Sequence, residues 1–443
     1  MDLLLTGGRL FDSEVNIGIL SGKISYIGCD RQKAECVYDL DGLIVLPGMI
    51  DPHVHMRDLG QSDKEDWLSG SKAALAGGVT SLIDMPNTQP PTNDVKSLNM
   101  KIEAAQRSLV NYGFHVGVSP GNLKDLDDVL KNNVSAIAGV KVFLAETSSN
   151  EVIESVESVE QILKISAAYS RPVLFHHELF SSLRENLLKY QDDRYNDISF
   201  HDSIRSRSCE EDGIELIIRA AENTNAAVYI CHVSTRSGFE MISEAKKRGV
   251  NIIAEATPHH LFLNYNVSRK AGNFAKINPP LRSEADRSFL YNALRSDLFD
   301  IIGSDHAPHQ IELKQKSYKD APSGFPGLET SLPLLIDRVL NRELSFEQVA
   351  ALTAEAPANY FGIKERGYLR EGYFADFVIV DPGKNWQVDP ESFFSKAHYS
   401  PFRDTVLKGK IVQTWVNGKQ AYCEGKVIAD APGKQLEFYK KAI

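Results

Sequence analysis

The composition is that of an ordinary globular protein, and it argues against several function classes. The 443 residues exceed the usual size of a single domain, and 42% of them are hydrophobic while 24% are charged. A net charge of −10 argues against nucleic acids and anionic membranes as partners. No apolar run approaches the roughly 18 residues that span a bilayer.

The cysteines indicate a reducing compartment. They are scattered and odd in number, without a CxxC pair, which argues against a disulfide framework and a zinc ribbon. The start MDLLLTGGRL lacks the basic region of a secretion signal. We therefore expect a cytoplasmic protein.

The first 47 residues predict antiparallel sheet. Segments such as LLLTGGRLFD and NIGILSGKISYIG alternate apolar and polar residues and are separated by turns that contain glycine. The last segment, 368–443, has the same character in YLREGYFADFVIVDP and TVLKGKIVQTWVNGKQ. Because the two ends look alike, we expect 1–47 and 368–443 to build one small β-sandwich domain together.

The region 48–367 alternates short apolar runs with amphipathic segments. One such segment, DKEDWLSGSKAALAGG, predicts a helix with Asp63 as its N-cap and Gly77 and Gly78 as its stop. Near-continuous apolar strands between helices indicate a parallel sheet covered on both faces, and eight runs favour a closed (β/α)₈ TIM-type barrel. The runs are LIVLPGMIDPHVH, GVTSLIDMPN, YGFHVGVSP, IAGVKVFLAE, RPVLFHHE, AAVYICHVS, VNIIAEATPHH and FDIIGSDHAPH.

Candidate ligands and titratable groups follow the carboxyl ends of these runs, where barrels build their active sites. Each residue alone has an ordinary structural explanation: a lone histidine is usually a hydrogen-bonded core or surface residue, and Lys141 could be an edge lysine. The joint pattern is what favours a site. The residues concerned are His53, His55, Asn87, Lys141, His176, His177, His232, His259, His260, Asp305 and His309.

Three histidines lack this convergence. His115 lies in an apolar run with no convergent partner, so we interpret it as structural. We place His201 and His398 on the surface.

Imidazoles with a carboxylate suit Zn²⁺ and similar divalent ions. With this many ligands, two metals roughly 3.5–4 Å apart with a bridging hydroxide are expected. In the strand, His53, His55 and Arg57 share one face, so Arg57 can take an anionic group of a substrate beside a metal held by the two histidines.

With these residues the chain resembles the amidohydrolase superfamily. Within it, the chain resembles the dihydroorotases, which interconvert N-carbamoyl-aspartate and dihydroorotate in pyrimidine synthesis. The resemblance covers essentially the whole chain, in family order. The motifs that carry it are DPHVHMRD, AGGVTSLIDMPNTQPPT, GVKVFLAET, FHHE, ICHVST, EATPHHL, KINPPLR, SDHAPH and GFPGLET.

The resemblance implies a two-metal centre. His53 and His55 would bind the more buried ion, His176 and His232 the other, and Lys141, carboxylated by CO₂, would bridge both, although some relatives use Asp as the bridge. In FHHE the family spacing His-x-Glu selects His176 as the ligand. His177, like His259 and His260, would then contact the ligand residues and not a metal ion. The ions would be Zn²⁺, although the same ligands accept Co²⁺ or Mn²⁺.

The resemblance also implies roles in the reaction. Asp305 would bind the first metal and shuttle the proton from the bridging hydroxide to the departing ring nitrogen. Arg57, Asn87 and His309 would hold the substrate carboxylate. Asn278 and the backbone around Ser323 and Gly324 would read the ring amides, and 309–329 would form a lid or lining loop.

Two other functions compete. Dihydropyrimidinases (hydantoinases) and allantoinases share the barrel, the histidine pair and the lysine, but their substrates lack the ring carboxylate and need no Arg57. Dihydropyrimidinases also carry a tyrosine shortly after the lysine, where this chain reads KVFLAET. A non-catalytic scaffold subunit is the alternative of another class, and it predicts missing ligands. The partner we expect is the small-molecule substrate, with a homodimer as the assembly.

Overall fold

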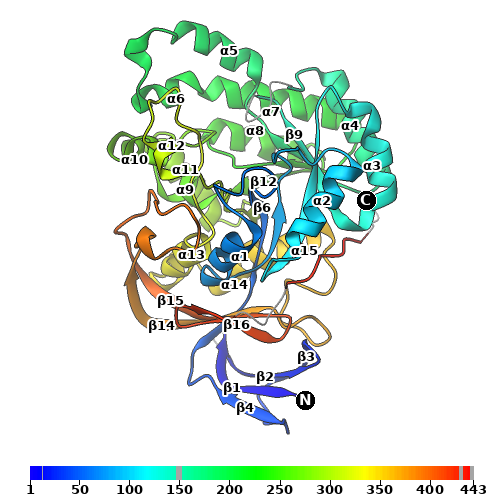
Figure 1. Cartoon of the computed structure of the whole chain (residues 1–443), viewed down its shortest axis with the longest axis vertical. Coiled ribbons are helices and arrows are strands. Elements are labelled where there is room, and N and C mark those ends of the chain that lie inside the picture. Colours follow the sequence, from blue (N-terminus) through cyan, green and yellow to red (C-terminus); the bar gives the residue numbers. More distant parts are fainter. Residues whose placement is uncertain (12, 146–151, 429–432, 440–443) are drawn as a thin grey trace.

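The computed structural model describes residues 1–11, 13–145, 152–428 and 433–439. Within them the chain forms a barrel surrounded by helices, with a sheet domain beneath it that contains the N-terminus (Figure 1). Glu146 and Thr147 of the GVKVFLAET motif lie outside the described residues.

The central barrel is a parallel sheet in which neighbours in sequence are neighbours in space, from β13 to β6. A parallel bridge between Val54 and His306 joins its two edges, where His55 N donates to His306 O at 2.8 Å. This confirms the (β/α)₈ prediction. The strands are β6 (Met49–Val54), β7 (Val79–Asp84), β8 (Asn111–Val118), β9 (Ile137–Phe143), β10 (Val173–His176), β11 (Val228–Ile230), β12 (Ile252–Ala256) and β13 (Ile301–Ile302).

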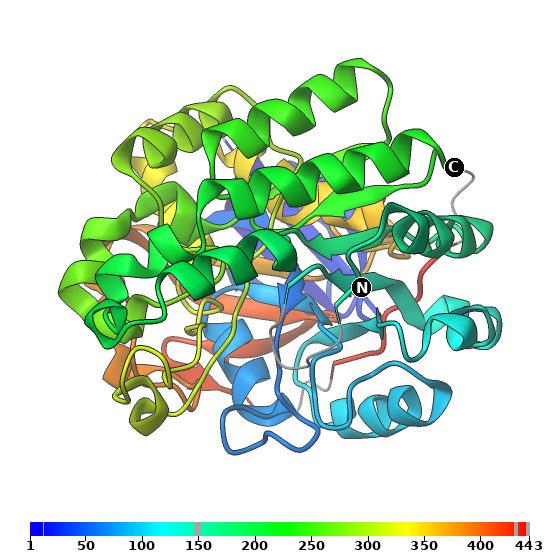
Figure 2. The same ribbon diagram turned by 90° about the horizontal axis from the view of Figure 1, so that it is seen from above.

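Helices lie outside the strands (Figure 2). Their apolar faces form the main core with the outward side chains of the barrel. The major helices are α1 (Trp67–Ala76), α2 (Val95–Ala105), α3 (Leu126–Asn133), α4 (Val156–Ala168), α5 (Phe180–Lys189), α7 (Arg207–Glu222), α8 (Arg236–Lys247), α11 (Glu284–Arg295) and α13 (Ser331–Leu340). The short ones are α6 (His201–Ile204), α9 (Pro258–Phe262), α10 (Tyr265–Ala271), α12 (Ile311–Lys314), α14 (Phe346–Ala350) and α15 (Ala356–Phe361).

The first helix begins later than predicted. Its N-cap is Asp66, not Asp63, because the Asp66 side chain accepts from the backbone of Leu68 and Ser69 and the Ser69 hydroxyl reaches back to complete a capping box. The predicted stop is observed, since Gly77 is the C-cap.

The two chain ends build a sheet together, apart from the barrel sheet, as predicted, while its folding into a sandwich domain stays a prediction. In the described part of the chain they build one nine-stranded sheet, in which β5 pairs with β14 and so joins the two ends. Its strands are β1 (Leu3–Leu10), β2 (Ser13–Leu20), β3 (Lys23–Gly28), β4 (Cys36–Asp39), β5 (Ile44–Pro47), β14 (Phe377–Gln387), β15 (Val406–Val416), β16 (Lys419–Cys423) and β17 (Lys426–Val427).

The sheet has a core of its own, to which both ends contribute, with Ile17 and Val45 packed near Phe377 and Trp415. The exact boundaries at 47/48 and 367/368 stay a prediction. Residues 433–439 return to the barrel, where Gln435 bridges to Tyr112 of β8.

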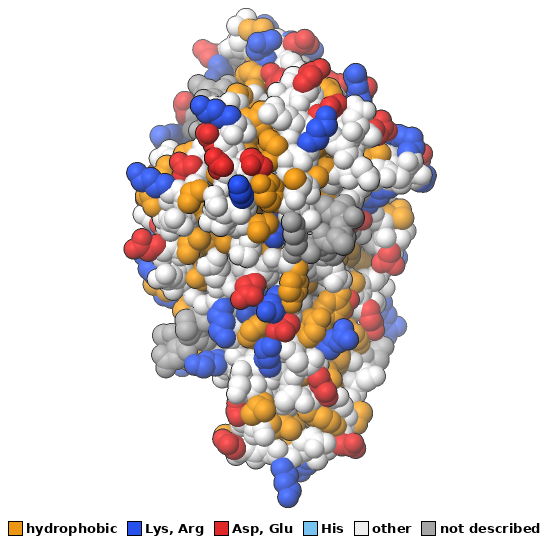
Figure 3. Space-filling view, turned by 90° about the vertical axis from the view of Figure 1, so that its right-hand side faces the viewer, with side chains coloured by type: hydrophobic (Ala, Val, Ile, Leu, Met, Phe, Trp, Pro, Cys, Tyr) orange, Lys and Arg blue, Asp and Glu red, His pale blue; other side chains and the backbone are white. Residues whose placement is uncertain are grey.

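On the face drawn in Figure 3, acidic and basic side chains are interspersed. Among the described residues no helix combines the length and the apolar character needed to cross a membrane.

Candidate active site

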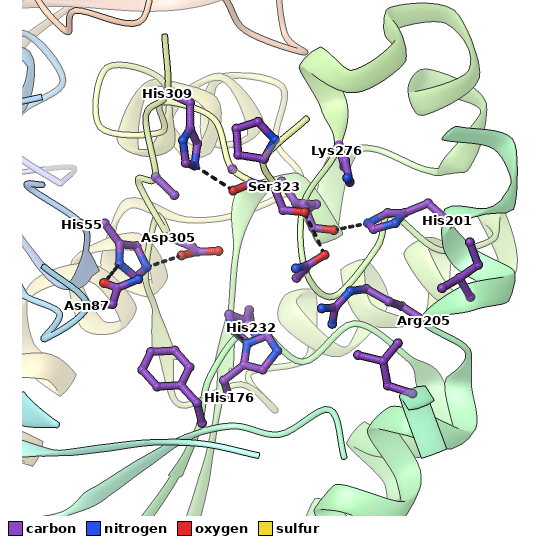
Figure 4. A pocket seen from close by; sticks show the side chains of 18 of the residues that line it. His55, Asn87, His176, His201, Arg205, His232, Lys276, Asp305, His309 and Ser323 are labelled. Carbon is purple, nitrogen blue, oxygen red and sulfur yellow. Dashed lines mark hydrogen bonds and ion pairs between the residues drawn. The ribbon is translucent and has the colours of Figure 1, made fainter. Parts of the chain in front are cut away.

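A cavity of about 650 Å³ opens at the carboxyl ends of the barrel strands. The twelve residues predicted to carry function all line it: His53, His55, Arg57, Asn87, Lys141, His176, His232, Asn278, Asp305, His309, Ser323 and Gly324. Figure 4 shows His55, Asn87 and Asp305 on one wall, with His201, Arg205 and Lys276 across from them.

The ring nitrogens of His53, in β6, and of His55, just after it, converge on Asp305. His53 Nδ1 lies 3.0 Å from the carboxylate of Glu255, and His55 Nδ1 lies 2.6 Å from Asn87 Oδ1. Both of these oxygens accept, so each Nδ1 donates, and each Nε2 is the ring nitrogen turned toward Asp305. The two Nε2 atoms lie 3.3 and 3.1 Å from Asp305 Oδ1, which is a group of ligand atoms that can hold a metal ion.

A second pair of imidazoles lies across the barrel. His176 Nε2 donates to Glu178 at 2.9 Å, and its Nδ1 lies 3.2 Å from His232 Nε2. Among the described residues, no partner contacts His232 Nδ1. Burial lowers the pKa of His176 to about 4 and that of His232 well below its ordinary value, so both rings are neutral and able to bind a cation.

Lys141 lies on β9 between these pairs. It is 1% exposed, and its Nζ lies 2.9 Å from Cys231 Sγ. Within the described residues Lys141 forms no ion pair. A buried amine without a carboxylate partner beside four histidines fits the chemistry of a bridging carbamate, and the donor set as a whole fits divalent metals.

Asp305 is positioned to carry charge at neutral pH. Burial alone would raise its pKa, but the imidazoles of His53 and His55 hold it well below its ordinary value. Its backbone lies in the left-handed region at φ 48°, as do Arg57 at 63° and His232 at 35°. Strained backbone of this kind concentrates at functional sites.

A second set of groups can receive an anion. Arg57 is 6% exposed, its Nε donates to Pro308 O at 3.3 Å, and its Nη2 lies 3.1 Å from His309 Nε2. Asn87 Oδ1 is taken by His55, which leaves the Asn87 amide hydrogens for another acceptor. Burial and the nearby Arg57 cation keep the pKa of His309 well below its usual range.

Ser323 and Gly324 face Asn278 on a third wall. The Ser323 hydroxyl donates to Asn278 Oδ1 at 3.0 Å, so the Asn278 amide hydrogens stay available to a ligand. Gly324 has φ 126°, and a Cβ there would lie 2.4 Å from Ala307 O, so the close approach requires glycine.

Of the other histidines, His115 is structural, as predicted, while the supporting role of His177, His259 and His260 stays a prediction. His177 is buried with Nε2 3.5 Å from Glu210, and His260 bonds Thr257 and the carbonyl of Pro279. His115 is buried and bonds the Pro52 carbonyl at 3.0 Å.

The surface prediction for His201 is wrong. It is buried, lines the cavity, and bonds Tyr318 at 2.9 Å and the Ile277 carbonyl at 2.7 Å. His201 is the first residue of the short helix α6. The connection that contains it folds back over the strand ends, and its sequence shows no helical or strand periodicity. His398 is half-buried and bonds the Pro390 carbonyl at 3.3 Å.

Three residues that contact the candidate site were not predicted from the sequence. Glu255 bonds His53 and the backbone N–H of His232, and its one signal was a glutamate inside the apolar run of β12. Arg205 lines the cavity and pairs with Glu178, holding the pKa of that carboxyl at about 2 together with His176. Lys276 is the third, within KINPPLR.

Comparisons with known proteins show the family to which this chain belongs. A model of the amidohydrolase family matches residues 44–421. The dihydroorotase of Methanothermobacter thermautotrophicus is 35% identical over 94% of this chain and 93% of its own, and that of Pyrococcus abyssi is 33% identical over 98% of each. Among solved structures, the L-hydantoinase (dihydropyrimidinase) from Arthrobacter aurescens superposes with a TM-score of 0.93 at 28% identity, covering 99% of this chain and 100% of its own. The chain therefore belongs to the amidohydrolase family, on its dihydroorotase branch.

Proposed function

We propose that this protein is a metal-dependent dihydroorotase that interconverts N-carbamoyl-L-aspartate and (S)-dihydroorotate in pyrimidine (UMP) synthesis. The observation that carries the substrate is Arg57, a buried guanidinium beside His309 in the wall next to the histidine cluster. A cation buried there without an acidic partner in hydrogen-bond reach among the described residues is costly unless a ligand carboxylate completes its environment.

The centre would hold two divalent ions, which we propose to be Zn²⁺. His53, His55 and Asp305 would hold one and His176 and His232 the other, with Lys141, carboxylated by CO₂, between them. When bound, the ions polarise the ring-amide carbonyl and lower the pKa of water enough for attack at neutral pH.

Side chains of the cavity would transfer the proton and bind the substrate. The Asp305 carboxylate accepts the proton that the attacking water loses, and delivers it to the ring nitrogen as its bond to the carbonyl carbon breaks. Cyclisation reverses these steps. Arg57, Asn87 and His309 hold the carboxylate, while Asn278, Ser323 and Gly324 face the amide edge of the ring.

Hydantoinase is the second candidate, because the L-hydantoinase structure covers the whole chain. Arg57 favours dihydroorotate over a neutral ring. A non-catalytic scaffold is disfavoured because each proposed ligand position is filled.

Turnover of dihydroorotate by metal-replete protein, followed in the ultraviolet with dihydrouracil and allantoin in parallel, tests the proposal. Turnover of dihydroorotate alone supports it. Turnover of a neutral ring alone would move the protein to the hydantoinases, and a protein that retains no stoichiometric metal would be the scaffold.

For the setting, we propose a cytoplasmic homodimer that binds no nucleic acid. The net charge of −10 and the interspersed charges of Figure 3 support the last point.

A further inference from the structure

The loop that carries Ser323 and Gly324 is folded around a buried ammonium group. Lys314, the last residue of α12, is 1% exposed. Its Nζ lies 3.2 Å from Lys276 O and 2.9 Å from both Pro322 O and Gly324 O. A neutral amine has only two hydrogens, so three carbonyl acceptors are satisfied only by the ammonium form.

A second lysine extends this arrangement. Lys276 Nζ donates to Tyr318 O and Ala321 O, both at 2.6 Å, and lies 4.4 Å from the centre of the Tyr318 ring. The Lys276 backbone carbonyl in turn accepts from Gly324 N at 2.8 Å. The two lysines thus bind the same short stretch of backbone.

The consequence is a loop whose carbonyls point inward. Four carbonyls of residues 318–324 meet the two ammonium groups, and Ser323 O lies 3.0 Å from His309 Nε2. Tyr399 adds its hydroxyl to Gly324 O at 3.2 Å. With the carbonyls held in this way, the side chain of Ser323 is turned to Asn278 at the cavity wall.

Retaining two neighbouring cations here is costly. Burial lowers the pKa of Lys314 well below its ordinary value and that of Lys276 to about 8, and nearby positive charges, Lys276 and Arg57 for Lys314, lower them further. An apolar side chain could fill the same space without this desolvation penalty. Lys314 is not among the described residues that line the cavity, so its effect on a ligand must pass through the loop.

We infer that Lys314, with Lys276 beside it, is a positioning residue for ring recognition: the two ammonium groups bind the carbonyls of residues 318–324 and so hold Ser323 and Gly324 where the amide edge of the ring binds. The inference rests on the proposed function for the identity of that ring.

Lys314→Met tests the inference, because methionine keeps an unbranched side chain only one atom shorter and removes all three donors. The expected result is a KM for dihydroorotate raised at least tenfold, exceeding any loss in kcat, with full metal content. Arg171→Met is the matched control. Arg171 is likewise a buried cation, and among the described residues its hydrogen-bond partners are all backbone carbonyls, those of Val134, Ser170, Phe438 and Tyr439; it is not among the described residues that line the cavity.

Arg171→Met should lower the melting temperature and leave KM within twofold of wild type. An unchanged KM in folded Lys314→Met would overturn the inference, as would an equal rise in the Arg171 variant. If Lys314→Met does not fold, Lys314→Gln, which retains two donor hydrogens, should raise KM by a smaller factor, and no rise would overturn the inference as well. The proposed function fails separately: if wild type turns over only dihydrouracil, the same KM comparison is made with dihydrouracil, which has the same amide edge.

Discussion

Asp305 shows how single residues are adapted to a task in this site. Its carboxylate lies within 3.3 Å of two imidazoles, which keep it ionised, while its backbone occupies the left-handed region at φ 48°. For a non-glycine residue this conformation costs about 1 kcal/mol or more, and the surrounding structure must stabilise it. Arg57 and His232 share the same conformation, so strain coincides with proposed function at three positions.

The proton-shuttle role predicts that Asp305→Asn keeps metal through His53 and His55 but loses turnover by about 10² to 10⁴-fold, since asparagine cannot accept a proton. Metal analysis and steady-state kinetics on the same preparation check this. Asp300→Asn is the control. Asp300 immediately precedes β13, the strand that leads to Asp305. It pairs with Lys246 and is not among the described residues that line the cavity, so the turnover of Asp300→Asn should stay near that of wild type. Substantial activity in Asp305→Asn would remove Asp305 from the shuttle role.

At the scale of elements, the strand ends were predictable and the long connections were not. His53, Lys141, His176 and His232 follow apolar runs, and parallel strands bring their carboxyl ends together, so the sequence order alone places these residues in one site. Nothing local connects His201 with that site. It reaches the cavity because the segment before α7 folds back over the barrel, which depends on tertiary contacts. Asp66 rather than Asp63 caps α1 because the N-cap is the residue whose side chain accepts from the backbone N–H three residues later, which here is that of Ser69.

Another element-scale feature is a buried acid where the loop before α13 meets the β domain. Glu329 accepts from the backbone N–H of Phe394 at 2.9 Å and of Ser395 at 3.3 Å, while the Ser395 hydroxyl donates to Glu65. Burial, with the nearby Glu65, raises the pKa of Glu329 to about 8. The folded protein therefore binds more protons than the unfolded chain between the ordinary pKa of 4.5 and pH 8.

This linkage predicts that Glu329 makes the free energy of unfolding fall as pH rises from 4.5 to 8, by about 1 kcal/mol per pH unit. Glu329→Gln removes the titration, so its unfolding free energy should fall less steeply over that range. Denaturation of both proteins at pH 5, 6.5 and 8 measures the difference in slope. Equal slopes would mean that Glu329 is ionised in the folded protein throughout.

At the scale of the whole molecule, the described segment 433–439 packs against the barrel together with α15. Leu436 and Phe438 are 1% and 4% exposed and join the core cluster formed by Ile50, Ala138 and other residues near the amino ends of the strands. Figure 1 shows this segment running from the sheet domain up the side of the barrel. The sequence did not predict that 433–439 packs on the barrel, because seven residues that directly follow predicted β-strands carry no pattern that separates them from the sheet.

Phe438→Ala should lower the free energy of unfolding by about 3–5 kcal/mol, because it removes a buried ring from this core. KM for dihydroorotate should be unchanged, since the site lies at the other end of the strands. Tyr439→Ala, at a side chain that is 49% exposed, should cost less than about 1 kcal/mol. Equal losses of unfolding free energy in the two variants would show that burial of the Phe438 ring does not stabilise the fold.

Arg57 is proposed to select a ring that carries a carboxylate, and a kinetic comparison of two substrates distinguishes this role from a structural one. kcat/KM is measured for wild type and Arg57→Met with dihydroorotate and with dihydrouracil, which lacks the carboxylate. A charged hydrogen-bonded pair of this kind is worth about 3 kcal/mol, so the variant should lose about 100-fold on dihydroorotate. It should lose less than about threefold on dihydrouracil. Equal losses on both rings would contradict the account, because Arg57 would then serve the fold or the metal centre and not the substrate carboxylate.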